Sequence, residues 1–86
     1  MIFERSERYR RSYRRLTQDD KEHVRKALRL LVRDMRHPSL RVRRMQGIVG
    51  ICEARASRDL RITFEVTQGV ALLRNVGHHD ATLRSP

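Results

Sequence analysis

The spacing of apolar residues divides the chain into a first half with helical periodicity and a second half with strand-like alternation. Residues 2–4 suit a short edge strand, and residues 6–16 carry apolar side chains at helical spacing, at Tyr9, Tyr13 and Leu16. A second helix follows, and its apolar stripe is the clearest in the sequence, formed by Val24, Ala27, Leu28, Leu31 and Met35. The first half therefore predicts one short strand and two helices.

The ends of the second helix carry recognisable signals. Thr17 can accept a hydrogen bond from the first turn as an N-cap, and Asp19 and Asp20 add negative charge to that turn, where the helix dipole favours it. Pro38 is expected to stop the helix, because a proline keeps the residue before it, His37, out of the helical region. The predicted helix begins after Thr17 and ends before the proline.

The second half alternates between apolar and polar residues from position 40 onward, with turns marked by Gly47 and Gly50. Three apolar-rich segments then follow one another over short connections: "ICEARAS", "LRITFEV" and "VALLRNV". Short connections between consecutive strands predict an antiparallel meander. We therefore expect an α+β fold, with a short N-terminal strand and two helices packed on an antiparallel sheet, as a single domain over residues 1–86.

The register of the first hairpin follows from the apolar pattern. Every second residue of "LRITFEV" is apolar, so that face must cover the core. Pairing Ala54 with Ile62 keeps the small apolar residues of the preceding strand on the same face. This register places Arg55 and Arg61 together on the opposite, polar face.

The last strand is expected to pair with the strand before it by simple alternation. The predicted partners are Phe64 with Leu73, Thr63 with Arg74, and Arg61 with Val76. The chain leaves the sheet at Gly77, so the segment "GHHD" emerges at the end of the polar face. The sequence thus predicts that His78, His79 and Asp80 lie beside Arg55, Asp59 and Arg61.

Charge adds information about partners. The 86 residues contain 20 Lys+Arg against 10 Asp+Glu, a formal net charge of +10, and only Lys21 and Lys26 are lysines. Such a field favours a polyanionic partner, which can be RNA, DNA or an acidic protein. The arginines of the first helix repel one another at helical spacing, and an anionic partner would offset that cost, although they could also form only a solvated face.

Composition disfavours several other classes. The single cysteine, Cys52, can form neither a disulfide nor a thiolate zinc site within one chain. No apolar run reaches the length of a signal peptide or a membrane span, so we expect a cytoplasmic protein with no membrane partner. Aromatic residues are too few for a platform that stacks single-stranded bases.

Three local patterns occur in order in the second half: Glu-x-Arg in "GICEARAS", Asp-x-Arg-Ile-x-Phe in "RDLRITFEV", and Gly-His in "LLRNVGHHD". With the predicted order of elements, they resemble the RelE/ParE superfamily of toxins from type II toxin-antitoxin systems, and within it the RelE/YafQ-type mRNA interferases. The resemblance covers roughly the whole chain and is most specific from His37 to Asp80. It implies a ribosome-dependent endoribonuclease that inhibits translation, with mRNA, the ribosome and a cognate antitoxin as partners and no small-molecule substrate.

The chemistry implied by the resemblance is attack by the RNA's own 2′-hydroxyl, which needs a base, cations for the phosphate and an acid for the leaving oxygen, and no metal or cofactor. Arg61 resembles the family's phosphate-stabilising arginine, and His78 resembles the YafQ-like C-terminal histidine, with His79 adjacent as an alternative. The implied catalytic set is His78, His79, Arg61, Arg55 and Asp59. The expected RNA-binding set is Arg74, Arg41, Arg43, Arg44, Arg11 and Arg15.

The sequence departs from the family in two places, because no tyrosine follows the histidines and the lysine cluster of RelE itself is absent. Both departures favour a YafQ-like set over a RelE-like one. Two other functions stay open: a ParE-like inhibitor of DNA gyrase, and an inactive relative that only binds nucleic acid or an antitoxin.

The residues also have purely structural interpretations. The two histidines could be exposed turn residues, and their contiguity with Asp80 makes a metal site unfavourable because three adjacent side chains do not easily converge. Glu53 and Glu65 are expected to pair across strands with Arg55, Arg61 or Arg74, and Glu53 is a secondary choice as a catalytic base.

Overall fold

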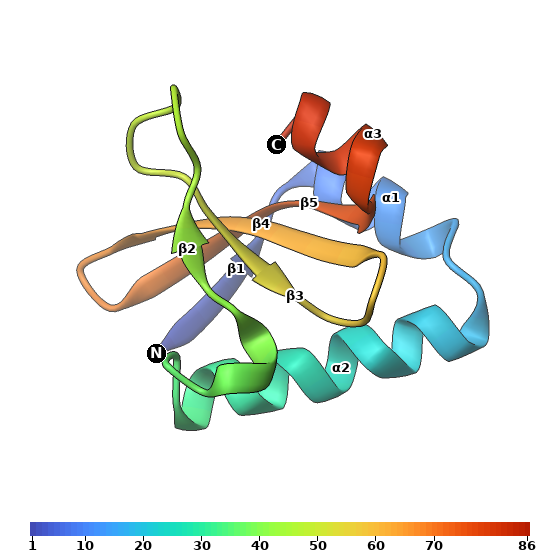
Figure 1. Ribbon diagram of the computed structural model, residues 1–86, viewed down its shortest axis with the longest axis horizontal. Helices are drawn as coiled ribbons and strands as arrows, with labels where there is room; N and C mark the ends of the chain where they lie inside the picture. The colour runs from blue at the N-terminus through green and yellow to red at the C-terminus, as the bar shows by residue number, and fades with distance from the viewer.

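The structure is a computed structural model that describes residues 1–86. It is a five-stranded sheet in the order β1-β5-β4-β3-β2, with two helices packed against it and a short third helix at one end (Figure 1). The elements are β1 (Ile2–Arg5), α1 (Glu7–Arg14), α2 (Gln18–Arg33), the 3₁₀ helix η1 (Pro38–Leu40), β2 (Arg43–Arg44), β3 (Cys52–Arg55), β4 (Leu60–Thr67), β5 (Val70–His78) and α3 (His79–Arg84). The expected α+β class is confirmed.

The sheet is mixed, because the N-terminal strand, whose direction the sequence left open, runs parallel to its neighbour. Strands β3, β4 and β5 form the predicted antiparallel meander. Strand β1 instead runs parallel to β5, with Ile2 opposite Val70. A parallel neighbour is possible here because α1 and α2 carry the chain back across the sheet before the meander begins.

Helix α2 begins where the sequence predicts, but it ends earlier than expected. The Thr17 hydroxyl accepts a hydrogen bond from the backbone N–H of Asp20 at 3.1 Å, which confirms the N-cap. Helix α2 ends at Arg33, well before Pro38, and Met35 lies outside it with 37% of its surface exposed. The reason is local, because the Asp34 carboxylate accepts a hydrogen bond from the N–H of Arg36 and closes a competing turn.

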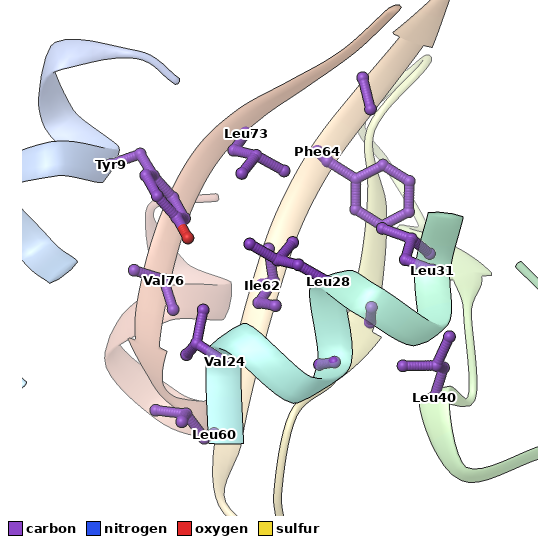
Figure 2. Packing of buried hydrophobic residues seen from close by; sticks show 13 residues of the cluster. Tyr9, Val24, Leu28, Leu31, Leu40, Leu60, Ile62, Phe64, Leu73 and Val76 are labelled. Carbon is purple, nitrogen blue, oxygen red and sulfur yellow. The ribbon is translucent and has the colours of Figure 1, made fainter. Parts of the chain in front are cut away.

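One hydrophobic cluster holds the two helices on the sheet. Tyr9 of α1 and the remaining predicted stripe residues of α2 pack on the inward-facing side chains of β4 and β5 (Figure 2). The labelled members of the cluster are Tyr9, Val24, Leu28, Leu31, Leu40, Leu60, Ile62, Phe64, Leu73 and Val76. This packing fixes the sheet relative to the start of α2, which matters for the site below.

The register is as predicted up to the middle of the last hairpin. Ala54 lies opposite Ile62, and Phe64 lies opposite Leu73, as the apolar pattern requires. Both pairings place apolar side chains under α2.

Beyond that point a β-bulge shifts the pairing by one residue. Thr63 pairs with Asn75, so Arg74 is the extra residue, and the predicted Thr63–Arg74 pair is wrong. Val76 consequently lies opposite Ile62, and not beside Arg61 as predicted. Without the bulge, Leu73 and Val76 would point to opposite faces; with it, both are buried in the core.

A short helix that the sequence pattern did not predict closes the chain. Helix α3 follows β5 directly and packs Thr82 onto the backbone of Gly77. The side chain of Asn75 donates a hydrogen bond to the carbonyl of Ser85 at 2.8 Å. The histidines therefore lie at a strand–helix junction and not on a free tail.

Strand β2 is also shorter than the alternation suggests, with two residues in the sheet. None of the helices has the length and apolar character that crossing a membrane requires.

Candidate active site

A polar cleft of about 670 Å³ lies between the β3–β4 loop and α3. Its lining contains all five of the predicted catalytic residues together with four others: Arg55, Arg58, Asp59, Arg61, His78, His79, Asp80, Ala81 and Arg84. The structure thus brings together residues from the end of β3, the following loop, β4, β5 and α3. Whether they are catalytic stays a prediction.

Strand pairing explains why these residues meet. Arg55 lies opposite Arg61 in the β3–β4 pair, and Leu60 lies opposite His78 in the β4–β5 pair. The backbone N–H of His79 donates a hydrogen bond to the carbonyl of Asp59 at 2.7 Å. The start of α3 is therefore tied directly to the β3–β4 loop.

Arg61 is the most fixed cation of the cleft. Its Nη1 donates hydrogen bonds to the carbonyls of Ser57 and Arg58, both at 3.1 Å, and to that of Leu60 at 3.2 Å. Partial burial, and then the positive charge of Arg55, lower the pKa of Arg61 from its ordinary value. An arginine still remains charged at neutral pH, so an anion bound between the two guanidinium groups would relieve an existing repulsion.

The two histidines have different partners. Nε2 of His78 lies 3.5 Å from Oδ2 of Asp20, at the start of α2, and the His78 side chain is 69% exposed. Nδ1 of His79 lies 3.1 Å from Oδ1 of its neighbour Asp80. Asp20 was interpreted from sequence only as part of a helix start, and no signal in the sequence links it to His78.

The remaining predicted residues lie outside the cleft. Arg74, displaced by the bulge, donates to the Glu65 carboxylate at 3.3 Å, and Arg43 donates to the Glu53 carboxylate. Both glutamates thus pair across strands. Glu65 pairs with one of the expected arginines, whereas Glu53 pairs with Arg43, which was not among them. The other members of the predicted RNA-binding set are exposed: Arg11, Arg15, Arg41 and Arg44.

Two cleft cations were missed. Arg58 lies in the β3–β4 turn, directly before the predicted Asp59, and the hairpin register alone could have placed it there. Arg84 reaches the cleft only because α3 folds back, and its Nε donates to the carbonyl of Asp80 at 3.4 Å.

The chemistry open to this cleft follows from its side chains. Guanidinium groups bind phosphate oxygens, and an imidazole can accept or donate a proton near neutral pH. Nowhere do three or more His, Cys, Asp or Glu side chains gather in a way that could hold a metal ion.

The chain matches no protein-family model, and no curated protein matches it in sequence. Comparison with solved structures does find relatives of the fold. YafQ from E. coli strain BL21(DE3) superimposes with a TM-score of 0.78 at 16% identity, covering 93% of this chain and 94% of that one. The YoeB/ParE toxin from Agrobacterium tumefaciens gives a TM-score of 0.76 at 14% identity, covering 92% and 99%.

An archaeal toxin-antitoxin structure is similar as well. The RelB-RelE antitoxin-toxin complex from Methanococcus jannaschii gives a TM-score of 0.74 at 12% identity, covering 100% of both chains. The chain thus has the fold of the RelE, YafQ and YoeB/ParE toxins, which confirms at the level of fold the resemblance read from its sequence.

Proposed function

We propose that this chain is the toxin of a type II toxin-antitoxin pair and that it cleaves messenger RNA on the ribosome in the cytoplasm. The observation that carries the proposal is the cleft, which gathers two histidines, two aspartates and four arginines. It lies in a fold shared with YafQ and RelE. The cleft residues come from separate elements, so their meeting is a property of the fold and not of one sequence motif.

In the proposed reaction the RNA's 2′-hydroxyl attacks the adjacent phosphorus, and the bond from phosphorus to the 5′-oxygen breaks. One imidazole accepts the proton of the 2′-hydroxyl, and a protonated imidazole donates a proton to the leaving 5′-oxygen. His78 and His79 are the groups available for these two transfers. Arg61 stabilises the pentavalent phosphate and Arg55 binds a non-bridging oxygen. Asp59 helps to hold the loop and its positive charges in place, and the reaction uses no metal.

Basic residues outside the cleft are proposed to bind ribosomal RNA. They are Arg11, Arg15, Arg41, Arg43, Arg44 and Arg74. Binding through so many phosphate contacts falls steeply as salt rises. Such contacts orient the toxin on the ribosome without reading sequence.

The proposed partner in the resting state is an antitoxin encoded beside this chain. Solved relatives include the E. coli DinJ-YafQ toxin-antitoxin complex and the intact E. coli RelBE complex. A chain with a formal charge of +10 favours an antitoxin whose binding segment is acidic.

The test is primer extension on a messenger RNA in a translating extract. The purified chain should cut the messenger RNA within codons only when ribosomes are present. The double substitution His78→Ala/His79→Ala should abolish this cleavage. Cuts that survive in the folded double variant would move proton transfer to another residue, with Asp59 and Glu53 next in order. No cuts with either protein would refute the mRNA-cleavage proposal, and a gyrase DNA-cleavage assay would then test the ParE-like alternative.

A further inference from the structure

A second hollow, of about 420 Å³, adjoins the cleft between α2 and the β3–β4 loop. We call it the side pocket. It is lined by His23, Lys26, Ala27, Leu30, Ser39, Leu40, Arg55, Ala56, Ser57 and Arg58. Arg55 and Arg58 line both hollows, so the cleft and the side pocket adjoin at these two arginines.

The charges of the side pocket are of one sign. No carboxylate lines it, whereas the cleft contains Asp59 and Asp80. Lys26, Arg55 and Arg58 form no ion pair, whereas five other arginines of the chain pair with a glutamate. Three uncompensated cations around one hollow attract an anion.

The floor of the side pocket is apolar. Leu40 and Ala27 are buried in its base, and Leu30 and Ala56 are partly buried beside them. The hydroxyl of Ser39 lies at its edge and hydrogen-bonds Nδ1 of His37 at 2.8 Å. A cationic rim over an apolar floor suits a nucleotide, because the phosphate lies on the cations and the sugar or base lies on the floor.

We infer that the side pocket binds the nucleotide next to the cleaved phosphodiester bond, with its phosphate held by Lys26 and Arg58. This inference rests on the proposed function, since it assumes that an RNA strand occupies the cleft. A strand whose reacting phosphate lies on Arg55 and Arg61 has to continue out of the cleft, and the shared arginines make the side pocket its continuous cationic path. That continuity favours RNA over an acidic peptide as the occupant.

The chain offers a matched pair of variants for the test. Lys26 and Lys21 are the two lysines of the chain and both lie on α2, but Lys21 lies over the Tyr13 ring, 5.7 Å from its centroid, and lines neither hollow. Lys26→Gln and Lys21→Gln remove the same charge from the same helix. Lys26 is exposed, so neither folding nor the core is expected to change.

Binding is measured on ribosomes programmed with a messenger RNA whose A-site codon carries 2′-O-methyl groups, which remove the attacking hydroxyl. The RNA also carries 4-thiouridine next to that codon for crosslinking. Lys26→Gln should weaken binding about fivefold and lower the slope of log affinity against log salt by about 0.7, the value for one lost phosphate contact on a single strand. Lys21→Gln should match the wild type, and crosslinks should map to α2 or the β3–β4 loop.

Equal losses in both variants, no loss in either, or crosslinks to other segments only would overturn the side-pocket assignment. Weaker binding of Lys26→Gln without the expected crosslink would also overturn the assignment, because Lys26 would then contact ribosomal RNA and not the messenger RNA. Cleavage of unmodified messenger RNA by the wild type is measured in parallel. If cleavage occurs while the binding test fails, the proposed function stands and the side-pocket assignment does not. If the binding test succeeds without cleavage, the mRNA-cleavage proposal fails, and the side pocket binds RNA but not next to a cleaved bond.

Discussion

The contact between His78 and Asp20 distinguishes two neighbouring histidines that the sequence leaves equivalent. The partner of His79 is Asp80, the next residue, whose side chain is 87% exposed. The partner of His78 comes from a different element, and the Asp20 side chain is only 22% exposed. A carboxylate held in place at the start of a helix can orient an imidazole. An exposed carboxylate on the adjacent residue moves together with the imidazole and cannot orient it. We therefore favour His78 as the histidine that transfers the proton.

Replacing Asp20 by Asn should lower the single-turnover rate of mRNA cleavage about tenfold, because a poorly oriented imidazole loses part of the gain that a positioned acid or base gives. Affinity for programmed ribosomes should stay unchanged. The N-cap should survive, since Thr17 bonds the backbone N–H of Asp20 and not its side chain. The cleavage rate and the affinity for ribosomes are measured separately by varying the toxin concentration at a fixed concentration of ribosomes.

The control for that variant is Asp19→Asn, which removes the same charge one residue earlier in the first turn of α2. It should cleave at the wild-type rate. Equal slowing in both variants would indicate a helix-dipole or stability effect, and no slowing in Asp20→Asn would contradict a positioning role.

Among the elements, the parts of the fold that the sequence predicts are those that long-range apolar patterning controls. Alternation in β4 indicated its core face and the Ala54–Ile62 pairing, and that pairing was enough to bring Arg55 and Arg61 together. The histidines were placed beside them by the β4–β5 hairpin, although its predicted register was one residue off beyond the bulge. The bulge at Arg74 was beyond this reasoning because strict alternation contains no signal for an extra residue. It could have been inferred only by requiring Leu73 and Val76 to share the core face.

Helix α3 was missed for a different reason. It spans six residues, fewer than two turns, which is too short for a periodic pattern and too short to be stable alone. Its stability comes from tertiary contacts, chiefly Thr82 on Gly77 and the hydrogen bond from Asn75 to Ser85. The position of Arg84 in the cleft depends on those contacts and was therefore not predictable.

The contact that holds α3 can be tested by replacing Gly77 with Ala. A Cβ at this position would lie 2.7 Å from Oγ1 of Thr82, too close for a carbon and an oxygen that are not bonded, so the Thr82 side chain, α3 or β5 has to shift. The free energy of unfolding, measured by urea denaturation, should fall by about 1–3 kcal/mol. Cleavage should fall as well, because α3 carries His79 and Arg84 into the cleft.

The clash explanation is checked by a double-mutant cycle with Thr82→Ala. Thr82 is buried, so this substitution has a cost of its own. If the two side chains clash, the double variant should be more stable than the sum of the single effects predicts, by about 1 kcal/mol. Additive effects would show that Gly77 is required for another reason.

At the scale of the whole molecule, charge predicted the kind of partner but not where it binds. The excess of arginine indicated a polyanion from composition alone. The structure shows that part of this charge is paired on the surface, as in Arg25 with Glu22, while the cations around the cleft and the side pocket are not. The position of β1 was likewise not predictable, because nothing in its four residues specifies which strand they pair with or in which direction.

The unpaired charge should make the free protein more stable as salt rises. Between about 0.01 M and 0.15 M salt the screening length falls from about 30 Å to about 8 Å, which weakens both repulsion and exposed ion pairs. Repulsion outweighs the pairs because Lys and Arg outnumber Asp and Glu by 20 to 10. The free energy of unfolding in urea should therefore rise by roughly 1 kcal/mol over this range.

A charge-reduced variant separates screening from other effects of salt. Arg10 and Arg44 are exposed and form no ion pair, so Arg10→Gln/Arg44→Gln removes repulsion without breaking a contact. At low salt this variant should be more stable than the wild type, and its stability should depend less on salt. Stability that instead falls with added salt in both proteins would mean that ion pairs such as Arg25–Glu22 outweigh the repulsion. The basic surface would then impose no cost on folding for an antitoxin or RNA to relieve.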